Sequence, residues 1–318
     1  MSTVTAKSGG RKSKAARFTK TFFLRLGFYF LLCALSFIFL YPFINMIVKS
    51  LMTDDDLYNI TVKWLPSQAT WSNYDIAFRR MRFKAYVWNN VIVCGVATLG
   101  HVVSCSLTGY AFARYKFRLK NVLFALVILM MIVPVQVIIF PLYKQYSDWG
   151  WLNRSDVLNF LPLVAPTFFG MGLNGGFFIF LFRQFFMGLP YEMEEAARVD
   201  GCGPIRTYAR IMLPMAQAPL LVCSVLSLVW HWNDYFEPGV YITAPAYRML
   251  PSVLPNLYAL LNQENHTMIQ VNELEGIVFN EAMLMAATFL CIIPILIAYL
   301  ILQRRFMEGV ERSGLTGM

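Results

Sequence analysis

The feature that most constrains this chain is a series of six apolar runs, each about as long as a lipid bilayer is thick. A helix needs roughly 20 mostly apolar residues to span the hydrocarbon core. The runs that meet this length are about Phe22–Val48, Val87–Ala113, Leu119–Leu142, Leu158–Phe182, Ala216–Phe236 and Ala282–Leu302. Each must be helical in lipid, because hydrocarbon offers no partner for backbone N–H and C=O groups. The sequence therefore predicts an all-α membrane protein with six transmembrane helices.

Composition supports lipid as the solvent and argues against a nucleic-acid partner. Apolar residues make up 58% of the chain and charged residues only 14%, which leaves too little polar surface to cover a water-soluble globule. The formal net charge is +9, but its densest part precedes the first apolar run, with no acidic residue among Lys7, Arg11, Lys12, Lys14, Arg17, Lys20 and Arg25. This placement is typical of a cytoplasmic anchor that faces anionic lipid. We therefore expect the bilayer, and no nucleic acid, as the partner of these charges.

The distribution of Lys and Arg predicts the orientation of the chain. If the N-terminus is inside, the inner segments 1–25, 114–120, 183–214 and 303–318 hold 18 of the 27 basic residues. Cytoplasmic segments of membrane proteins carry such an excess, so both termini are predicted to be cytoplasmic. The predicted organisation is a basic segment 1–21, a six-span domain 22–303 and a tail 304–318. Within the domain, 183–214 is expected inside and 237–281 outside.

Several residue types that could indicate an enzyme or a metal site lack the required spacing. The six cysteines are scattered without a C-x-x-C pair, and the three histidines show no H-E-x-x-H spacing, so we expect no metal site and no disulfide framework. No G-x-x-x-x-G-K-[ST] loop is present to cradle ATP phosphates. The G-x-G-x-x-G pattern at 170–175 lies inside an apolar run with no strand before it. It is therefore interpreted as close helix packing or a local break in the helix.

The inner segment between the fourth and fifth runs has the signals of two short helices joined by a turn. Pro190 suits a first helical position, and the acidic residues that follow it suit a helix N-terminus. Glu194 and Arg198 are spaced as an i,i+4 pair. Gly201 can adopt the left-handed conformation that ends a helix, and Pro204 can start the next one. These residues predict a rigid projection at the membrane face.

The full pattern in this segment is more specific than a pair of capped helices. Glu195-Ala196-Ala197 is followed after three residues by Gly201, and nine residues later by Ile211-x-Leu213-Pro214. Seven fixed residues at about 5% usage each occur by chance roughly once in 10⁹ start positions. The pattern resembles the signature of the permease subunits of ATP-binding-cassette (ABC) importers.

Most of the chain is similar to the carbohydrate-uptake branch of that superfamily, typified by the maltose importer. The similar stretches are Tyr41–Phe43, Trp64–Tyr74, Gly109–Arg114, Pro134–Gln136, Trp232–Tyr235 and Gln303–Gly309. Glu237-Pro238-Gly239 departs from the usual pattern, so that stretch gives no detail about the substrate. The resemblance implies the type I ABC importer permease fold in the bacterial inner membrane, with cytoplasmic coupling helices between spans four and five.

The resemblance also implies partners and roles. A cytoplasmic ABC ATPase dimer would dock on the projection, and the expected docking residues are Glu195, Ala196, Ala197, Gly201, Ile211, Leu213 and Pro214. A second permease subunit, in a heterodimer, would complete the path, and an extracytoplasmic solute-binding protein would deliver a sugar or oligosaccharide. ATP and Mg²⁺ would bind the partner ATPase. This chain is expected to bind no cofactor and to have no catalytic residues.

A cluster at the end of the fifth run could contact the substrate. It consists of Trp230, Trp232, Asn233, Asp234 and Tyr235, which offer ring faces and hydrogen-bonding groups of the kind found in ligand sites. A packed span end with interfacial aromatic residues explains the same residues without a ligand. Two other functional classes remain open, a transporter driven by an ion gradient and a membrane-embedded protease or lipase. Uptake without ATP would indicate the first, and turnover of a peptide or lipid the second.

Overall fold

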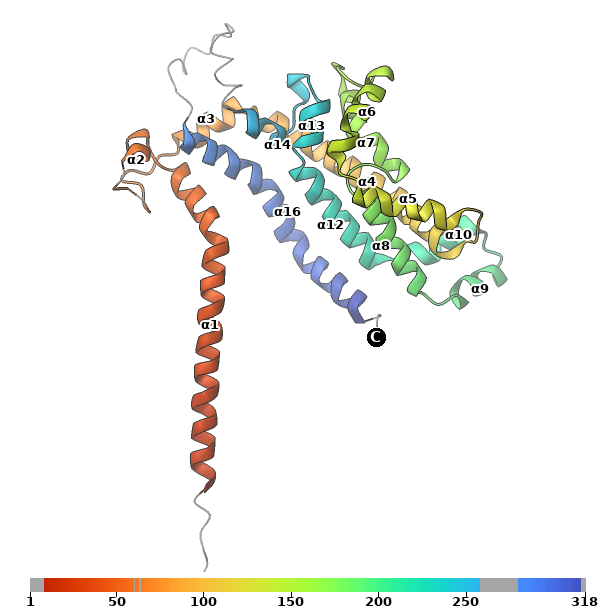
Figure 1. Ribbon diagram of the computed structural model, residues 1–318, viewed down its shortest axis with the longest axis horizontal. Helices are drawn as coiled ribbons and strands as arrows, with labels where there is room; N and C mark the ends of the chain where they lie inside the picture. Colours follow the sequence, from red (N-terminus) through yellow and green to blue (C-terminus); the bar gives the residue numbers. More distant parts are fainter. Residues whose placement is uncertain (1–8, 60, 63, 258–279, 316–318) are drawn as a thin grey trace, which may run out of the picture.

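The computed structural model describes residues 9–59, 61–62, 64–257 and 280–315, and every regular element within them is helical (Figure 1). The elements of the first half are α1 Gly9–Ser50, α2 Asp54–Tyr58, α3 Ser72–Arg80, α4 Phe83–Arg114, α5 Lys120–Ile132, α6 Val135–Asp148, η1 Val157–Phe160, α7 Leu161–Val164 and η2 Ala165–Phe169. Those of the second half are α8 Gly175–Gly188, α9 Glu192–Val199, α10 Pro204–Thr207, η3 Tyr208–Met212, α11 Leu213–Met215, α12 Gln217–Asn233, α13 Phe236–Tyr241, η4 Pro245–Tyr247, α14 Leu250–Val253, η5 Leu254–Asn256 and α16 Glu281–Leu315. The prediction of an all-α fold is confirmed.

Three of the six predicted spans are single helices of sufficient length and apolarity. These are α1 over Thr21–Ser50, α4, and α16 over Glu281–Gln303. The fifth run matches α12, which bends by 78° from the helical segment Pro204–Met215 before it. The third and fourth runs are interrupted, so the structure does not show six uninterrupted helices, and the number of complete crossings stays a prediction.

The third run, expected as one helix over Leu119–Leu142, is bent by 104° between α5 and α6. Pro134 lacks a backbone N–H and disfavours helical geometry at the residue before it. Val133 is accordingly extended, with ψ of 117°, and Pro134 caps α6 with ψ of 138°. The local chemistry of this one X-Pro pair therefore accounts for the difference from the expected continuous helix.

The fourth run, expected as one helix over Leu158–Phe182, is broken at the G-x-G-x-x-G stretch. Gly170 and Gly172 have φ of 71° and 85°, and Asn174 has φ of 60°, a left-handed region in which few other residues are stable. The break is held from one side by α4, because His101 of that helix places Nε2 at 3.1 Å from the Met171 carbonyl oxygen, while Met171, Gly172 and Asn174 are exposed. A break in a membrane helix is tolerated where neighbouring helices pair with the backbone groups that it frees. The interpretation of this motif as a local break is confirmed.

The helix α4 lies at the centre of the structure and packs most closely against α8. Gly109 permits the approach, because a Cβ atom there would lie 2.6 Å from Cβ of Phe182 and 2.9 Å from the backbone N of Arg183. Gly176 of α8 has a similar role against α5, where a Cβ atom would lie 2.8 Å from the Val127 carbonyl oxygen. Lipid provides no hydrophobic force between helices, so close backbone packing of this kind holds them together.

The helix α1 extends away from the other helices (Figure 1). Most of its apolar side chains between residues 22 and 44 are exposed. It contacts the rest of the chain near its end, where Lys49 Nζ lies 2.6 Å from Glu281 Oε1 at the start of α16. The helix starts at Gly9 and runs through the expected domain boundary at 21–22 without a break. Residues 1–8 lie outside the described part of the chain.

The segment that follows α1 is ordered by the buried carboxylate of Asp56. Asp56 accepts hydrogen bonds from the Ser67 hydroxyl and from the backbone N–H groups of Ser67 and Gln68. The Ser67 hydroxyl holds the pKa of this carboxyl below its ordinary value. These contacts fix the segment after α1 and carry no indication of a ligand.

Different short elements lie at the two ends of the long helices α4, α12 and α16 (Figure 1). In Figure 1, α2, α3, α13 and α14 lie at one end, whereas α9, α10 and the last turn of α16 lie towards the other. The expected loop 237–281 begins at the first of these ends with α13, and its residues 258–279 lie outside the described ranges. The segment 183–214 therefore lies at the opposite end from α13 and α14.

Candidate functional site

The helix α9 forms the first half of the projection predicted from the sequence. It begins at Glu192, two residues after Pro190, which therefore precedes the helix instead of occupying its first position. The Tyr191 carbonyl oxygen accepts hydrogen bonds from the N–H groups of Glu194 at 3.0 Å and Glu195 at 3.2 Å. Three acidic residues lie in the first turn, where the helix dipole favours negative charge.

The end of α9 is fixed by a glycine in the left-handed conformation, as predicted. Gly201 has φ of 76° and donates its N–H to the Arg198 carbonyl oxygen at 3.0 Å. The Cys202 N–H reaches the Ala197 carbonyl oxygen at 2.9 Å. This pair of bonds is the Schellman arrangement, which satisfies the last carbonyl groups of a helix. Pro204 then starts α10, which confirms the expected start of the second helix.

The two sides of α9 have different environments. Glu194 and Ala197, which are three residues apart and share one side of the helix, are 5% and 3% exposed. Glu195 and Ala196 are exposed on the other side. Ala197 was expected among the docking residues, but its side chain is buried and it lets α9 pack inward.

The exposed side continues past α9 with apolar side chains. Val199 is 87% exposed and Ile205 is 82% exposed, and Gly201 between them is exposed. We call Glu195, Ala196, Val199, Gly201 and Ile205 the docking face. Val199 and Ile205 were not predicted from the sequence, because the pattern does not tell which side of each short helix faces outward.

The second half of the sequence motif lies behind this face. Ile211 belongs to η3, a π-helical turn, and packs beside a buried cluster of α4 and α8 residues. Leu213 is half-buried, whereas Pro214 is exposed. The Tyr208 hydroxyl lies 2.7 Å from Ser106 Oγ of α4. Ile211 and Leu213 therefore anchor the projection to the helical body instead of standing on its outer surface.

The inner side of α9 contacts an arginine from the end of α4, which no sequence motif marks as its partner. Arg114, at the end of α4, places Nε at 3.1 Å from Glu194 Oε1. The expected i,i+4 partnership of Glu194 with Arg198 is wrong, because Glu194 is turned inward while Arg198 is exposed. The only sequence signal was that Arg114 ends the Gly109–Arg114 stretch.

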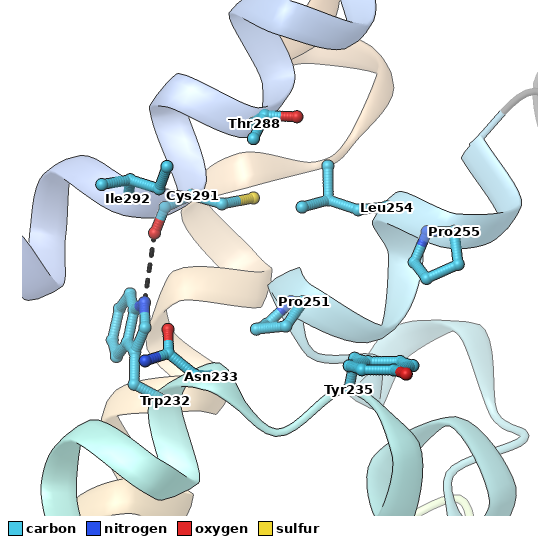
Figure 2. A pocket seen from close by; sticks show the side chains of 9 residues that line it. All are labelled: Trp232, Asn233, Tyr235, Pro251, Leu254, Pro255, Thr288, Cys291 and Ile292. Carbon is cyan, nitrogen blue, oxygen red and sulfur yellow. Dashed lines mark hydrogen bonds between the residues drawn. The ribbon is translucent and has the colours of Figure 1, made fainter. Parts of the chain in front are cut away.

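The expected substrate cluster is divided between a cavity and packed positions. A cavity of about 270 Å³ lies between the end of α12, the α14–η5 segment and α16 (Figure 2). Its lining consists of Trp232, Asn233, Tyr235, Pro251, Leu254, Pro255, Thr288, Cys291 and Ile292. Trp232 is held in place by its indole N–H, which donates to the Cys291 carbonyl oxygen at 3.1 Å.

Two members of that cluster lie elsewhere. Trp230 packs against the rings of Phe177 and Phe178 in α8, with ring centroids 5.6 Å and 5.3 Å apart. Asp234 Oδ1 accepts hydrogen bonds from the N–H groups of Phe236 at 3.0 Å and Glu237 at 3.3 Å, which stabilises the turn into α13. Neither residue lines the cavity. Besides the indole of Trp232, the lining side chains with hydrogen-bonding groups are Asn233, Tyr235 and Thr288.

Comparison with known proteins identifies a family and several relatives. Residues 106–312 match the model of the family described as "Binding-protein-dependent transport system inner membrane component". The chain is 27% identical over 297 residues to the arabinooligosaccharides transport system permease protein AraQ of Halalkalibacterium halodurans, covering 92% of this chain and 96% of the relative. It is 28% identical over 280 residues to the sn-glycerol-3-phosphate transport system permease protein UgpE of Yersinia enterocolitica, covering 86% and 91%.

A solved structure shares the fold. A chain of a bacterial ABC transporter involved in the import of the acidic polysaccharide alginate superposes with a TM-score of 0.66. It covers 96% of this chain and 100% of its own length, at 21% sequence identity.

Proposed function

Because the chain belongs to the family of binding-protein-dependent transport system inner membrane components and is a permease subunit of an ABC importer, we propose that it couples a separate ATPase to sugar import through the docking face. In this proposal a cytoplasmic ATPase dimer binds the docking face, and a second permease subunit completes the path. An extracytoplasmic solute-binding protein delivers the substrate. The chain itself supplies the membrane path and no catalytic group.

The observation that carries the proposal is the docking face itself. Val199 and Ile205 expose most of their apolar surface on a short capped projection, beside the carboxylate of Glu195 and the uncovered backbone of Gly201. Exposed apolar groups rimmed by polar ones are typical of protein–protein interaction sites. A rigid two-turn helix that ends in a Schellman cap could transmit force from a bound partner. We infer that this partner is the ATPase.

The substrate is proposed to be a sugar, oligosaccharide or related polar solute. This rests on the relatives, whose names include arabinooligosaccharides, starch degradation products and sn-glycerol-3-phosphate. The cavity beside Trp232, Asn233 and Tyr235 supports contact with such a solute at the end of the helices that carries α13 and α14. Ring faces and one amide group suit a hydroxyl-rich ligand. Trp230 and Asp234, which lie outside the cavity, are proposed to support it from behind.

The proposal predicts that uptake depends on the ATPase. The complex of this chain with its second permease, ATPase and binding protein would be placed in proteoliposomes containing ATP. Uptake of labelled arabinotriose, maltotriose and sn-glycerol 3-phosphate would then be measured. At least one solute should accumulate with the complete complex, and none after replacement of the ATPase's P-loop lysine, the residue that contacts the nucleotide phosphates.

Two results would contradict this proposal. Uptake driven by an ion gradient through this chain alone, without ATP, would favour a secondary transporter. Hydrolysis of ATP by the purified chain above a heat-denatured control would show a nucleotide site that the proposal does not contain. A matched control is the complete complex loaded with the non-hydrolysable ATP analogue, which should behave like the lysine variant.

The proposed orientation predicts the labelling of two positions by an impermeant thiol reagent in intact cells. Ser155 is exposed between α6 and α7, and Cys202 is half-exposed beside the docking face. In a background without the other cysteines, Ser155→Cys should be modified from outside, because an inside N-terminus places segment 143–157, between the third and fourth apolar runs, on the outer side. Cys202 should react only after the membrane is permeabilised. The reverse pattern would mean that the predicted orientation, based on the excess of inner Lys and Arg, is wrong.

A further inference from the structure

One guanidinium group makes three contacts with the segment that presents the docking face. The Arg114 side chain is 0% exposed and its Nε atom lies 3.1 Å from Oε1 of Glu194, whose side chain is 7% exposed. Arg114 Nη2 donates a hydrogen bond to the Leu189 carbonyl oxygen at 2.7 Å. The guanidinium carbon also lies 4.3 Å from the centre of the Tyr191 ring. Arg114 therefore contacts two residues that precede α9, Leu189 and Tyr191, and one residue in its first turn, Glu194.

The position of this contact is electrostatically favourable at both ends. Arg114 is the last residue of α4, and a cation is stabilised at a helix C-terminus. Glu194 lies in the first turn of α9, where an anion is stabilised. A buried charge with its partner removed is costly, so each group holds the other inside the protein. The planar guanidinium can make all three contacts at once, which a lysine ammonium group cannot do.

The same contact lies between the docking face and the centre of the helical body. Among the described elements, α9 packs chiefly with α10, which follows it in the chain, and Arg114 adds a side-chain link to α4. The helix α4 packs in turn against α8, α12 and η2. A displacement of α9 at the membrane surface would therefore reach the centre of the helical body through Arg114.

We propose that Arg114 is a positioning residue that ties α9 to the end of α4, so that movement imposed on the docking face is passed to the membrane helices. The inference rests on the proposed function, in which an ATPase binds that face. It assigns Arg114 to coupling and not to docking, because its side chain is buried behind α9. Glu194 is its partner in the same role.

The test separates ATPase binding from the use of ATP. Arg114→Gln removes the charge, and the matched control Arg118→Gln removes the same charge from an exposed position of the loop between α4 and α5. Both variants would be compared with wild type in the complete complex in proteoliposomes, using the three labelled solutes named above. The readouts are ATPase retained per permease, ATP hydrolysed, and solute accumulated per ATP.

The expected result is a specific loss of coupling. Arg114→Gln should retain the ATPase at the wild-type ratio and hydrolyse ATP, while solute accumulated per ATP falls about tenfold, the scale at which contacts in a coupling network act. Arg118→Gln should match wild type. The double variant Arg114→Gln/Glu194→Gln should lose no more than Arg114→Gln alone, because residues that act as one unit are not additive.

Two results would overturn the inference. The first is a wild-type ratio of solute to ATP in Arg114→Gln, and the second is loss of the ATPase from that variant, which would assign Arg114 to docking. If Arg114→Gln does not accumulate, Arg114→Lys decides the question: it keeps the charge but not the planar fork, and it should give an intermediate ratio. Absence of ATP-dependent uptake in the wild-type complex would instead contradict the proposed function.

Discussion

Replacing Gly201 with valine is expected to release the ATPase from the permease while leaving the chain in the membrane. Gly201 has φ of 76°, and a β-branched residue held in that conformation costs on the order of 1–3 kcal/mol. No atom within 4 Å would contact an added Cβ, so the penalty comes from the backbone alone. The Schellman bonds to Ala197 and Arg198 would open, and α9, which has eight residues, would lose its fixed end.

The measurement is the amount of ATPase that co-purifies with the permease, together with ATP-dependent uptake. If the whole cost falls on the bound state, it corresponds to about a 5- to 150-fold loss of ATPase binding. Insertion of the chain into the membrane should be unaffected. The apolar spans insert because they are hydrophobic and because their backbone N–H and C=O groups are hydrogen-bonded within the helix. Equal extraction of wild type and variant from the membrane would verify this.

A neighbouring glycine provides the matched control. Gly203 is also exposed, and a Cβ atom added there would meet no other atom within 4 Å, but its φ of −71° and ψ of 165° suit any residue. Gly203→Val therefore adds the same side chain two residues away without backbone strain. Retention of the ATPase by Gly203→Val and its loss from Gly201→Val would support the docking assignment. Normal ATPase retention and uptake in Gly201→Val would contradict it.

The sequence predicted the apolar runs well, but not how two of them are interrupted. The runs that became α1, α4, α12 and α16 contain enough consecutive apolar residues to determine a helix in lipid without further information. The bend of 104° at Val133–Pro134 depends on the context of one proline. Pro42, Pro141 and Pro294 lie inside helices that continue through them, so a proline alone does not locate a bend.

In the segment that carries the docking face, features that depend on neighbouring residues were predicted, whereas contacts between distant residues were not. The cap at Gly201 and the helix start at Pro204 follow from residues next to each other in the chain, and both were predicted correctly. The partner of Glu194 was not, because Arg114 lies 80 positions earlier and local spacing favoured Arg198. The inward side of α9 was also undetermined, since small and acidic residues occur on both of its sides.

The cavity beside Trp232 was only partly predictable, because its two walls come from segments that are far apart in the sequence. Trp232, Asn233 and Tyr235 form a visible cluster of ring and amide groups in the sequence. The opposite wall comes from Pro251, Leu254 and residues of α16, which have no distinguishing chemistry of their own. Only the packing of α12 against α16 brings the two groups together. Trp230, two positions before Trp232 on the same helix, faces α8 instead, as the 3.6-residue period of the helix requires.

Replacing Gly109 with valine is expected to prevent the assembly of the helical body, and this should be the largest effect of any single change considered. An added Cβ would lie 2.6 Å from Cβ of Phe182, 2.9 Å from the backbone N of Arg183 and 3.0 Å from the Ile179 carbonyl oxygen. Two of these atoms are backbone, which no side-chain rotation can move. Overpacking of a core typically costs about 1–3 kcal/mol even where side chains can adjust. Here α4 and α8 would have to separate.

The control for Gly109 lies on the same helix. Gly95 of α4 is exposed and has nothing within 4 Å of an added Cβ, so Gly95→Val changes helix propensity equally without a clash. After extraction in mild detergent, Gly95→Val should elute as one monodisperse species and unfold near the wild-type temperature. Gly109→Val should aggregate or unfold far below it. Identical behaviour of the two variants would mean that the close approach of α4 and α8 is not what holds the body together.

The clash of a valine at position 109 with α8 is also expected to affect the segment that carries the docking face. Arg114 lies five positions after Gly109, and its hydrogen bond ends on Leu189, the residue that directly follows α8. If α4 moves away from α8, the guanidinium is drawn from the Leu189 carbonyl oxygen and from Glu194 together. Any Gly109→Val protein that does assemble in the membrane should therefore also show the loss of solute accumulated per ATP expected of Arg114→Gln. A variant with normal coupling but lowered thermal stability would separate the packing of α4 from its proposed role in transmission.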